Sequence, residues 1–281
     1  MIEKEILDKT FKQITEKKPK KVFTGFKELD PLLLNMENGS LITIGGRPAM
    51  GKTSFITSII CNLMKQKKKC LLFSLDTSTN LFIKRLIANI GEIDLFGLSY
   101  TEFLKDKRID DIQKSIDTIS EFDLTIYDDI DDIDKIKEKI EAEKPEFVFI
   151  DYLQLLNIPP EKQRNEVISN MMLKFKNIAK ENNCIIYIAS QLSRAIESRC
   201  NKRPLLCDLK ESGDIENISD VVMFIYRDEY YKWYHDENDS YTKGEAEIIV
   251  AKHKMGAVGT VKLLFRSPIA KFLDPLICDE F

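Results

Sequence analysis

Cysteine, histidine and tryptophan are scarce in this chain, and their spacing limits what the protein can be. The 281 residues include six cysteines, none in a C-x-x-C pair, together with two histidines and one tryptophan. Structural zinc sites are usually built from closely spaced cysteines and histidines. The composition therefore argues against a zinc-stabilised fold, and we interpret the scattered cysteines as free thiols.

Long hydrophobic runs and an excess of basic charge are also lacking. No apolar stretch reaches the roughly 18 residues that a membrane span requires, and the opening residues MIEKE lack the apolar centre of a signal peptide. We therefore expect a cytoplasmic protein without a membrane partner. The net charge of −4 argues against a protein that coats nucleic acid through general positive charge, but it leaves room for a local basic channel.

The clearest positive signal is a glycine-rich stretch between a predicted strand and a predicted helix. Residues 46–53 read G-R-P-A-M-G-K-T, the spacing of a phosphate-binding loop, between apolar residues 41–44 and a helical pattern over 54–65. Backbone N–H groups of such a loop bind phosphate oxygens, Lys52 reaches the β- and γ-phosphates, and the Thr53 hydroxyl holds Mg²⁺. We therefore predict a site for ATP and Mg²⁺. Its predicted residues are Gly46, Arg47, Pro48, Ala49, Met50, Gly51, Lys52, Thr53 and Ser54.

Further strands and helices alternate along the rest of the chain. Helices are expected within 78–120, from the acidic run at 128–132 to about residue 143, and over 161–182. Strands are expected over 70–75, 124–127, 147–151, 184–190, 221–226, 245–251 and 260–265. This alternation predicts an α/β fold with a mostly parallel, twisted sheet that is covered by helices on both faces.

Polar side chains stand where several of these strands end. Asp76, Asp151 and Gln191 follow or close three apolar strands. Ligands bind at the carboxyl ends of parallel strands, so we expect these side chains beside the phosphate loop. A carboxylate such as Asp151 after an apolar strand is the second element of phosphate-loop ATPases, where it supports Mg²⁺. The acidic run at 128–132 could form a metal site, but a helix N-terminus is the favoured interpretation.

Six segments together resemble the RecA-like motor domain of DnaB-type replicative DNA helicases. They are residues 46–53, 149–155, 190–194, 202–204, 208–216 and 224–229. The resemblance runs from Thr24 to about Asp274 and implies a RecA-like phosphate-loop NTPase fold. We expect residues 22–281 to form this motor domain, and residues 1–21 to form a linker helix followed by a basic linker.

The resemblance implies roles for several residues around the nucleotide. Asp151 supports the metal, Gln191 senses the γ-phosphate and links the site to the DNA loops, and Arg227 packs near the adenine. Lys252 and Lys254 reach the nucleotide of the adjacent subunit. Without the resemblance, these two lysines would be interpreted as solvated residues on an edge strand.

The resemblance also implies contacts with single-stranded DNA. The loop around Lys210, Glu211 and Gly213 would line the central channel of a ring of identical subunits, expected to be hexameric. The loop around Lys162 and Arg164 is the second candidate for the channel. Lys210, Glu211 and Gly213 lie in a polar segment between two predicted strands, and for this reason we expect them in a loop.

The chain departs from the family pattern at two catalytic positions. It has S-L-D-T at 74–77 where the family has S-L-E-M, so that Asp76 replaces the glutamate that polarises the attacking water. It has K-H-K at 252–254 where the family has K-x-R, and lysine lacks the planar fork of arginine. Both changes affect hydrolysis rather than nucleotide binding.

Two functions from different classes remain open. The first is an ATP-driven, ring-forming DNA helicase motor that moves on single-stranded DNA in replication, with helicase loaders or replisome proteins as partners. The second is an ATP-binding, weakly hydrolysing relative that regulates or loads a replicative helicase. Only about twenty residues precede the motor-like part, so that the chain is either a piece of a longer protein or a motor-only relative of the kind that a phage or plasmid encodes.

Overall fold

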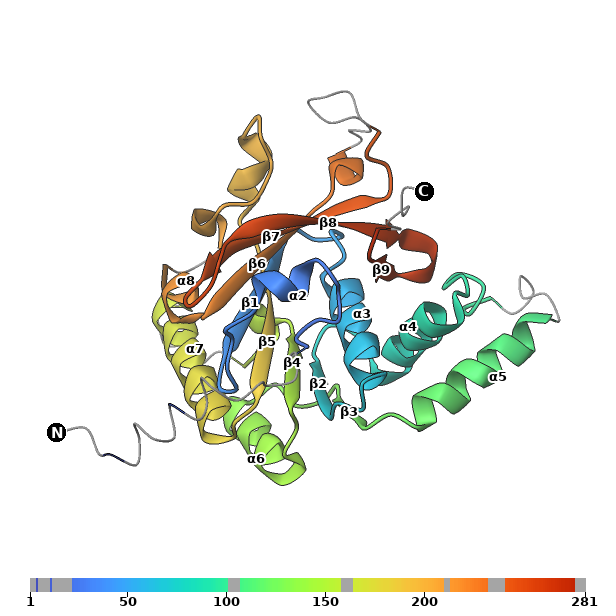
Figure 1. The fold of residues 1–281 in the computed structure, drawn as a ribbon, viewed down its shortest axis with the longest axis horizontal. Helices are drawn as coiled ribbons and strands as arrows, with labels where there is room; N and C mark the ends of the chain where they lie inside the picture. The colour runs from blue at the N-terminus through green and yellow to red at the C-terminus, as the bar shows by residue number, and fades with distance from the viewer. Residues whose placement is uncertain are drawn as a thin grey trace.

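A nine-stranded sheet forms the centre of the molecule in the computed structural model (Figure 1). The structure describes residues 4, 11, 22–100, 107–157, 164–209, 213–231 and 241–275. Strand order in the sheet is β3-β2-β4-β5-β1-β6-β7-β8-β9. The strands are β1 (Leu41–Gly46), β2 (Cys70–Ser74), β3 (Leu124–Tyr127), β4 (Phe147–Asp151), β5 (Ile185–Gln191), β6 (Val221–Tyr226), β7 (Glu245–His253), β8 (Gly259–Arg266) and β9 (Lys271–Leu273).

The first six strands pair in parallel, and the last three extend the sheet in antiparallel fashion. This confirms the predicted mostly parallel sheet of an α/β fold. The α-helices are α2 (Leu29–Leu32), α3 (Lys52–Met64), α4 (Thr79–Gly91), α5 (Lys107–Ser120), α6 (Ile133–Glu143), α7 (Arg164–Glu181) and α8 (Gly213–Ile218). Within the described ranges, no helix has the length and hydrophobicity needed to cross a bilayer.

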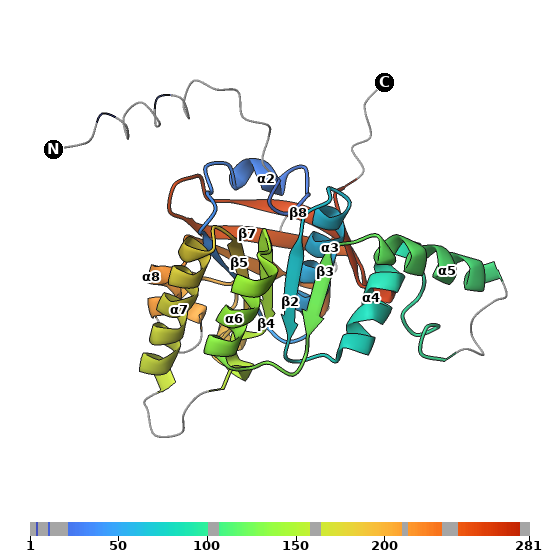
Figure 2. The same ribbon diagram turned by 90° about the horizontal axis from the view of Figure 1, so that it is seen from below.

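Helices cover both faces of the sheet, as Figures 1 and 2 show. Apolar side chains of α3 and α4 pack against one face, and those of α6 and α7 pack against the other. Successive residues of a strand point to opposite faces, so Phe149 of β4 joins the first core and Ile150 joins the second. All residues of β1, β4 and β6 are buried, which explains why these strands read as continuous apolar runs.

The register of the parallel strands brings their carboxyl ends to one edge. Gly46 at the end of β1 pairs with Gln191 at the end of β5, and Ser74 at the end of β2 pairs with Asp151 at the end of β4. The expected meeting of these strand ends beside the phosphate loop is thereby confirmed.

Two other sequence interpretations are decided by the fold. Asp132 at the end of the acidic run is the N-cap of α6, where its carboxylate accepts hydrogen bonds from the Asp134 and Lys135 amides at 2.9 and 3.1 Å. This confirms the helix-terminus interpretation. The edge-strand interpretation is wrong for Lys252, which lies in β7 between β6 and β8 and pairs with a residue of β6. Lys254 follows the end of β7 and is exposed, as a solvated residue would be.

A buried carboxylate fixes the segment that leads into the sheet. Asp30 accepts hydrogen bonds from the Thr24 amide at 2.8 Å, the Thr24 hydroxyl at 2.6 Å and the Gly25 amide at 3.1 Å. Burial raises the pKa of Asp30 despite these bonds. Its removal would leave donors without partners, which is costly in a protein interior.

We therefore expect Asp30→Ala to lower the free energy of unfolding by about 2–4 kcal/mol. Glu28→Ala is the matched control, because Glu28 is exposed two residues earlier and makes no capping bond with its side chain. Urea unfolding of both variants measures the difference. Equal midpoints for Asp30→Ala and Glu28→Ala would contradict the structural role given to Asp30.

Candidate nucleotide site

A cavity of about 480 Å³ opens at the carboxyl ends of the parallel strands. Its walls come from the phosphate loop, the start of α3, α4 and the β8–β9 region. The predicted site residues that line it are Pro48, Ala49, Gly51, Lys52, Thr53, Ser54, Asp76, Asp151, Gln191 and Arg227. The structure thus brings the phosphate loop and the three strand-end side chains into one cavity.

Backbone conformation gives the phosphate loop its sharp turn into α3. Gly51 is the N-cap of α3 with φ of 99°, in the left-handed region. A Cβ at this position would also come within 3.2 Å of the Phe272 ring. The backbone conformation favours glycine, and the close ring leaves little room for a side chain. The turn places the first residues of a 13-residue helix at the cavity wall, where the positive end of the helix dipole favours phosphate.

Lys52 lies inside the cavity with its ammonium on the loop's own carbonyls. Its Nζ donates to Gly46 O at 2.9 Å and to Arg47 O at 3.3 Å. Burial lowers the pKa of Lys52, while the charges of Asp151 and Asp76 act in the opposite direction. The ammonium is therefore within reach of an anion placed over the loop, and such an anion would further favour its charged form.

Thr53 and Asp151 supply oxygen atoms of the kind that Mg²⁺ prefers. The Thr53 hydroxyl donates to Asp151 Oδ2 at 2.6 Å, and the Asp151 side chain is buried at the end of β4. Burial raises the pKa of Asp151, while the bond from Thr53 and the charge of Lys52 lower it. A hydroxyl and a carboxylate in contact fit Mg²⁺, which is held by few protein oxygens together with substrate phosphates.

Asp76 lines the cavity just beyond the end of β2. Its side chain is exposed, and its amide donates to Asp151 O at 3.3 Å. Gln191 also lines the cavity, and its amide donates to Gln154 Oε1 at 3.1 Å. Both side chains are placed where they can contact a ligand next to the loop.

Arg227 forms a flat, partly apolar wall together with an aromatic ring. Its guanidinium lies 4.1 Å from the centroid of the Phe265 ring and donates to Ala49 O and to Glu229 Oε2, each at 3.3 Å. Burial lowers the pKa of Arg227, and its Nε has no hydrogen-bond partner among the described residues. A planar cation over a ring is suited to stacking against a nucleobase.

Arg85 is a site residue that the sequence interpretation missed. It comes from α4 and lines the cavity, and its buried Nε has no partner within the described part of the chain. Its charge also lowers the pKa of Asp151. A buried donor of this kind fits an anionic ligand. The available signal was an arginine between the core residues Phe82 and Leu86, nine positions after Asp76.

Lys252 and Lys254 lie outside this cavity. The Lys252 ammonium donates to Glu216 O and Asn217 O near the end of α8, and burial lowers its pKa. Lys254 is exposed and lines a separate hollow with His253. Neither lysine is placed to act on the nucleotide site of its own chain.

Most of the residues predicted to contact DNA lie outside the described part of the chain. Lys162, Lys210 and Glu211 are outside the described residues. Arg164 and Gly213 were expected in loops but are the first residues of α7 and α8. The loop assignment of these two positions is wrong: Arg164 begins the helix that was expected over 161–182, and Gly213 begins a six-residue helix that was not expected. Gly213 is exposed, with no atom within 4 Å of the position that a Cβ would occupy.

Solved structures with the same fold and related sequences are known. One that is described as an ATPase domain matches with a TM-score of 0.89 and 32% identity, covering 96% of this chain and 98% of that one. A structure of a DnaB-like replicative helicase, described with its interactions with primase, matches with a TM-score of 0.86 and 31% identity over 97% of this chain and 66% of the other.

Curated relatives are named as replicative helicases and are longer than this chain. The replicative DNA helicase DnaB of Rickettsia typhi is 36% identical over 89% of this chain and 56% of its own length. The protein of the same name from Helicobacter pylori is 31% identical over 96% of this chain and 64% of its own length. The family model described as the DnaB-like helicase C terminal domain matches residues 21–274. The chain therefore belongs to the DnaB-like helicase C-terminal domain family.

Proposed function

We propose that this chain is an ATP-hydrolysing, ring-forming motor that moves on single-stranded DNA during DNA replication. The observation that carries the proposal is the contact between Thr53 and Asp151 beside the Lys52 ammonium, at the carboxyl ends of β1 and β4. In a chain of this family, such an arrangement supports binding of ATP with Mg²⁺.

Each wall of the cavity has a proposed task in hydrolysis. Lys52 would neutralise the β- and γ-phosphates, and Thr53 with Asp151 would hold the Mg²⁺, which supplies neutralising charge to the phosphoryl group. Asp76 would accept a hydrogen bond from the attacking water, and Gln191 would contact the γ-phosphate. The base would stack against Arg227.

A ring of subunits would supply cations to the nucleotide site from the neighbouring chain. Phosphoryl transfer needs cations around the γ-phosphoryl oxygens in the transition state. Lys252 and Lys254 point elsewhere in their own chain, and we propose that they serve the nucleotide of the adjacent subunit in a homohexamer. The named relatives act in DNA replication, which supports primase or a helicase loader as partners and a cytoplasmic location.

The ring is tested by measuring the mass of the particle in solution by light scattering. Samples contain protein alone, with an ATP analogue, and with the analogue and a single-stranded oligonucleotide. We expect six chains per particle when both ligands are present. A particle that stays monomeric under all three conditions would contradict the ring.

Turnover is expected to be limited by the short carboxylate at position 76. Asp76 is exposed at the cavity wall, so a longer side chain has room there. We expect Asp76→Glu to raise DNA-stimulated turnover, by up to about a hundredfold if the missing methylene displaces the acceptor by ~1 Å. A steady-state assay with matched affinity measurements checks this. A fall in turnover at unchanged affinity would mean that the site is adapted to aspartate.

The second candidate function is an ATP-binding relative that loads or regulates a helicase. The observations that favour it are Asp76, which is one methylene shorter than glutamate, and Lys254, which cannot grip two oxygens as arginine does. It predicts nucleotide binding with little turnover even when DNA is present.

A further inference from the structure

The side chain of Arg47 leaves the phosphate loop and reaches the segment that follows β5. Its Nε donates to Glu197 Oε1 at 2.9 Å, and its NH1 donates to Leu192 O at 3.0 Å. Glu197 belongs to the short helix η3 (Arg194–Ser198) and also accepts a bond from the Tyr231 hydroxyl at 3.4 Å. One planar guanidinium thus holds two points of the same segment, in a fixed geometry that lysine could not reproduce.

The two ends of the segment held by Arg47 are bonded to each other. Leu192 forms an antiparallel bridge with Leu209, and the Ser193 amide donates to Asp208 O at 2.8 Å. Arg199 donates to both carboxylate oxygens of Asp208, at 3.0 and 2.6 Å. Residues 192–209 therefore form one braced unit whose last residue comes directly before the predicted DNA-contacting positions 210 and 211.

Arg47 is also bonded to the lysine that would meet the phosphates. The Lys52 ammonium donates to the backbone carbonyls of Gly46 and Arg47. A phosphate bound over the loop would compete for this ammonium. The hydrogen bond from Lys52 to the Arg47 carbonyl would then weaken or break. An unbroken chain of contacts then runs from Lys52 through Arg47 to Glu197 and Leu192.

We propose that the ion pair between Arg47 and Glu197 transmits nucleotide binding to the braced unit at 192–209. Glu197 acts as a positioning residue, since it does not line the nucleotide cavity. The inference rests on the proposed DNA motor function. It gives a second connection between the nucleotide site and the DNA loops, beside the one expected through Gln191. Coupling between two sites is reciprocal, so the same contact would carry the effect of DNA back to the phosphate loop.

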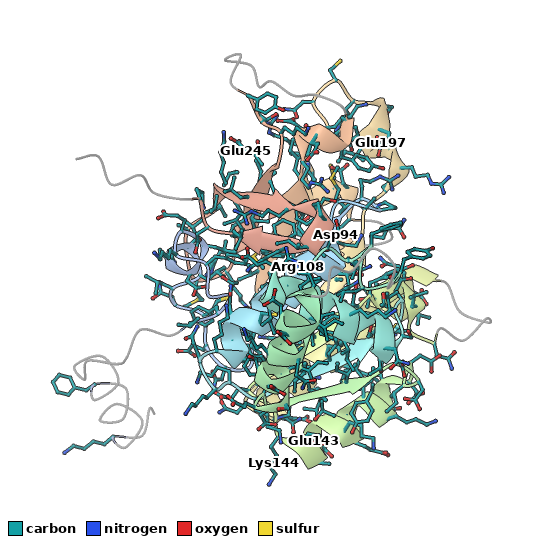
Figure 3. All side chains as sticks on the ribbon, turned by 90° about the vertical axis from the view of Figure 1, so that its right-hand side faces the viewer. Asp94, Arg108, Glu143, Lys144, Glu197 and Glu245 are labelled. Carbon is teal, nitrogen blue, oxygen red and sulfur yellow. The ribbon has the colours of Figure 1, made fainter. Side chains whose placement is uncertain are left out.

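Glu197→Ala tests the link, because it removes the acceptor and leaves the nucleotide cavity intact. Glu143→Ala is the matched control: Glu143 pairs with Lys69 at 3.4 Å, and its side chain is 31% exposed against 35% for Glu197. Figure 3 shows the two glutamates at opposite ends of the molecule. Glu197→Gln, which keeps the shape but loses the charge, separates charge from packing.

Two readouts are compared for wild type and variants. The first is hydrogen exchange of amides 193–209 with and without an ATP analogue, which needs no DNA. The second is the ratio of ATP turnover with and without single-stranded DNA. We expect Glu197→Ala to keep analogue affinity and basal turnover within about twofold, to lose the analogue-dependent change in exchange, and to reduce DNA stimulation at least about fivefold. Glu143→Ala should match wild type.

Several results would overturn the link. One is an exchange response of 193–209 in Glu197→Ala equal to that of wild type. Another is no response to analogue in wild type itself. A third is an equal loss of basal and stimulated turnover, which would mark a purely structural role. If wild type shows no DNA stimulation, the proposed function fails, whereas the exchange experiment still decides whether Glu197 links the two regions.

Discussion

Replacing Lys52 with alanine is expected to reduce ATP-analogue affinity, turnover or both by at least about a hundredfold. Lys52 is the cation that lines the cavity from the first turn of α3, and its ammonium is within 3.3 Å of the two carbonyls of the phosphate loop that hold it. A buried, charge-assisted contact with phosphate is much stronger than a surface ion pair. Alanine removes the charge and leaves the rest of the loop in place.

Lys65→Ala is the control for this experiment, because Lys65 is exposed at the other end of α3. Nucleotide titration and steady-state turnover are measured on both variants after urea unfolding has shown that each is folded. Affinity and turnover of Lys52→Ala equal to those of wild type would mean that the cavity is not the phosphate site.

Lys210→Glu is expected to weaken binding of single-stranded DNA at least about tenfold while nucleotide binding survives. In a ring, identical loops would stack along one strand, and each would offer one cation and main-chain N–H groups to the phosphate backbone. Reversing one charge per subunit therefore removes several favourable contacts at once. Such contacts are insensitive to sequence and weaken as salt rises.

Fluorescence anisotropy of a labelled oligonucleotide measures this effect at several salt concentrations, with and without ATP analogue. Lys114→Glu makes the same charge change at an exposed position on α5 and serves as the control. A net charge of −4 gives the chain no general attraction to DNA, so wild type should bind weakly without analogue. Tight binding without analogue, or equal binding by Lys210→Glu, would contradict the channel assignment.

The parts of the fold that the sequence predicts best are the buried parallel strands. The predicted bounds of β4 and β6 coincide with the observed ones, since a strand covered on both faces is a continuous apolar run that ends where a polar residue meets the cavity. The predicted bounds of β3 also coincide, although β3 is an edge strand whose residues are only partly buried. By contrast, β9 and α2 were not predicted. Each has three or four residues, too few for any hydrophobic period to emerge.

The candidate site was predictable where a motif fixes the backbone and not where packing orients a side chain. The phosphate loop places Lys52 and Thr53, and the end of an apolar strand places Asp151. An arginine between two core residues is the only local sign that Arg85 turns from α4 into the cavity, and no local sign indicates that Arg47 turns out of the loop toward Glu197. Those directions depend on residues distant in sequence, which only the packed fold brings together.

The rate of ATP hydrolysis with and without single-stranded DNA tests the proposed motor function most directly. The assay uses the unmodified chain at a saturating ATP concentration, and analogue affinity is measured on the same preparation. A motor whose nucleotide site is coupled to DNA should hydrolyse ATP severalfold faster when DNA is present, and this stimulation should fade with rising salt. Intact analogue binding with a rate that DNA does not change would contradict the motor and favour the regulatory relative.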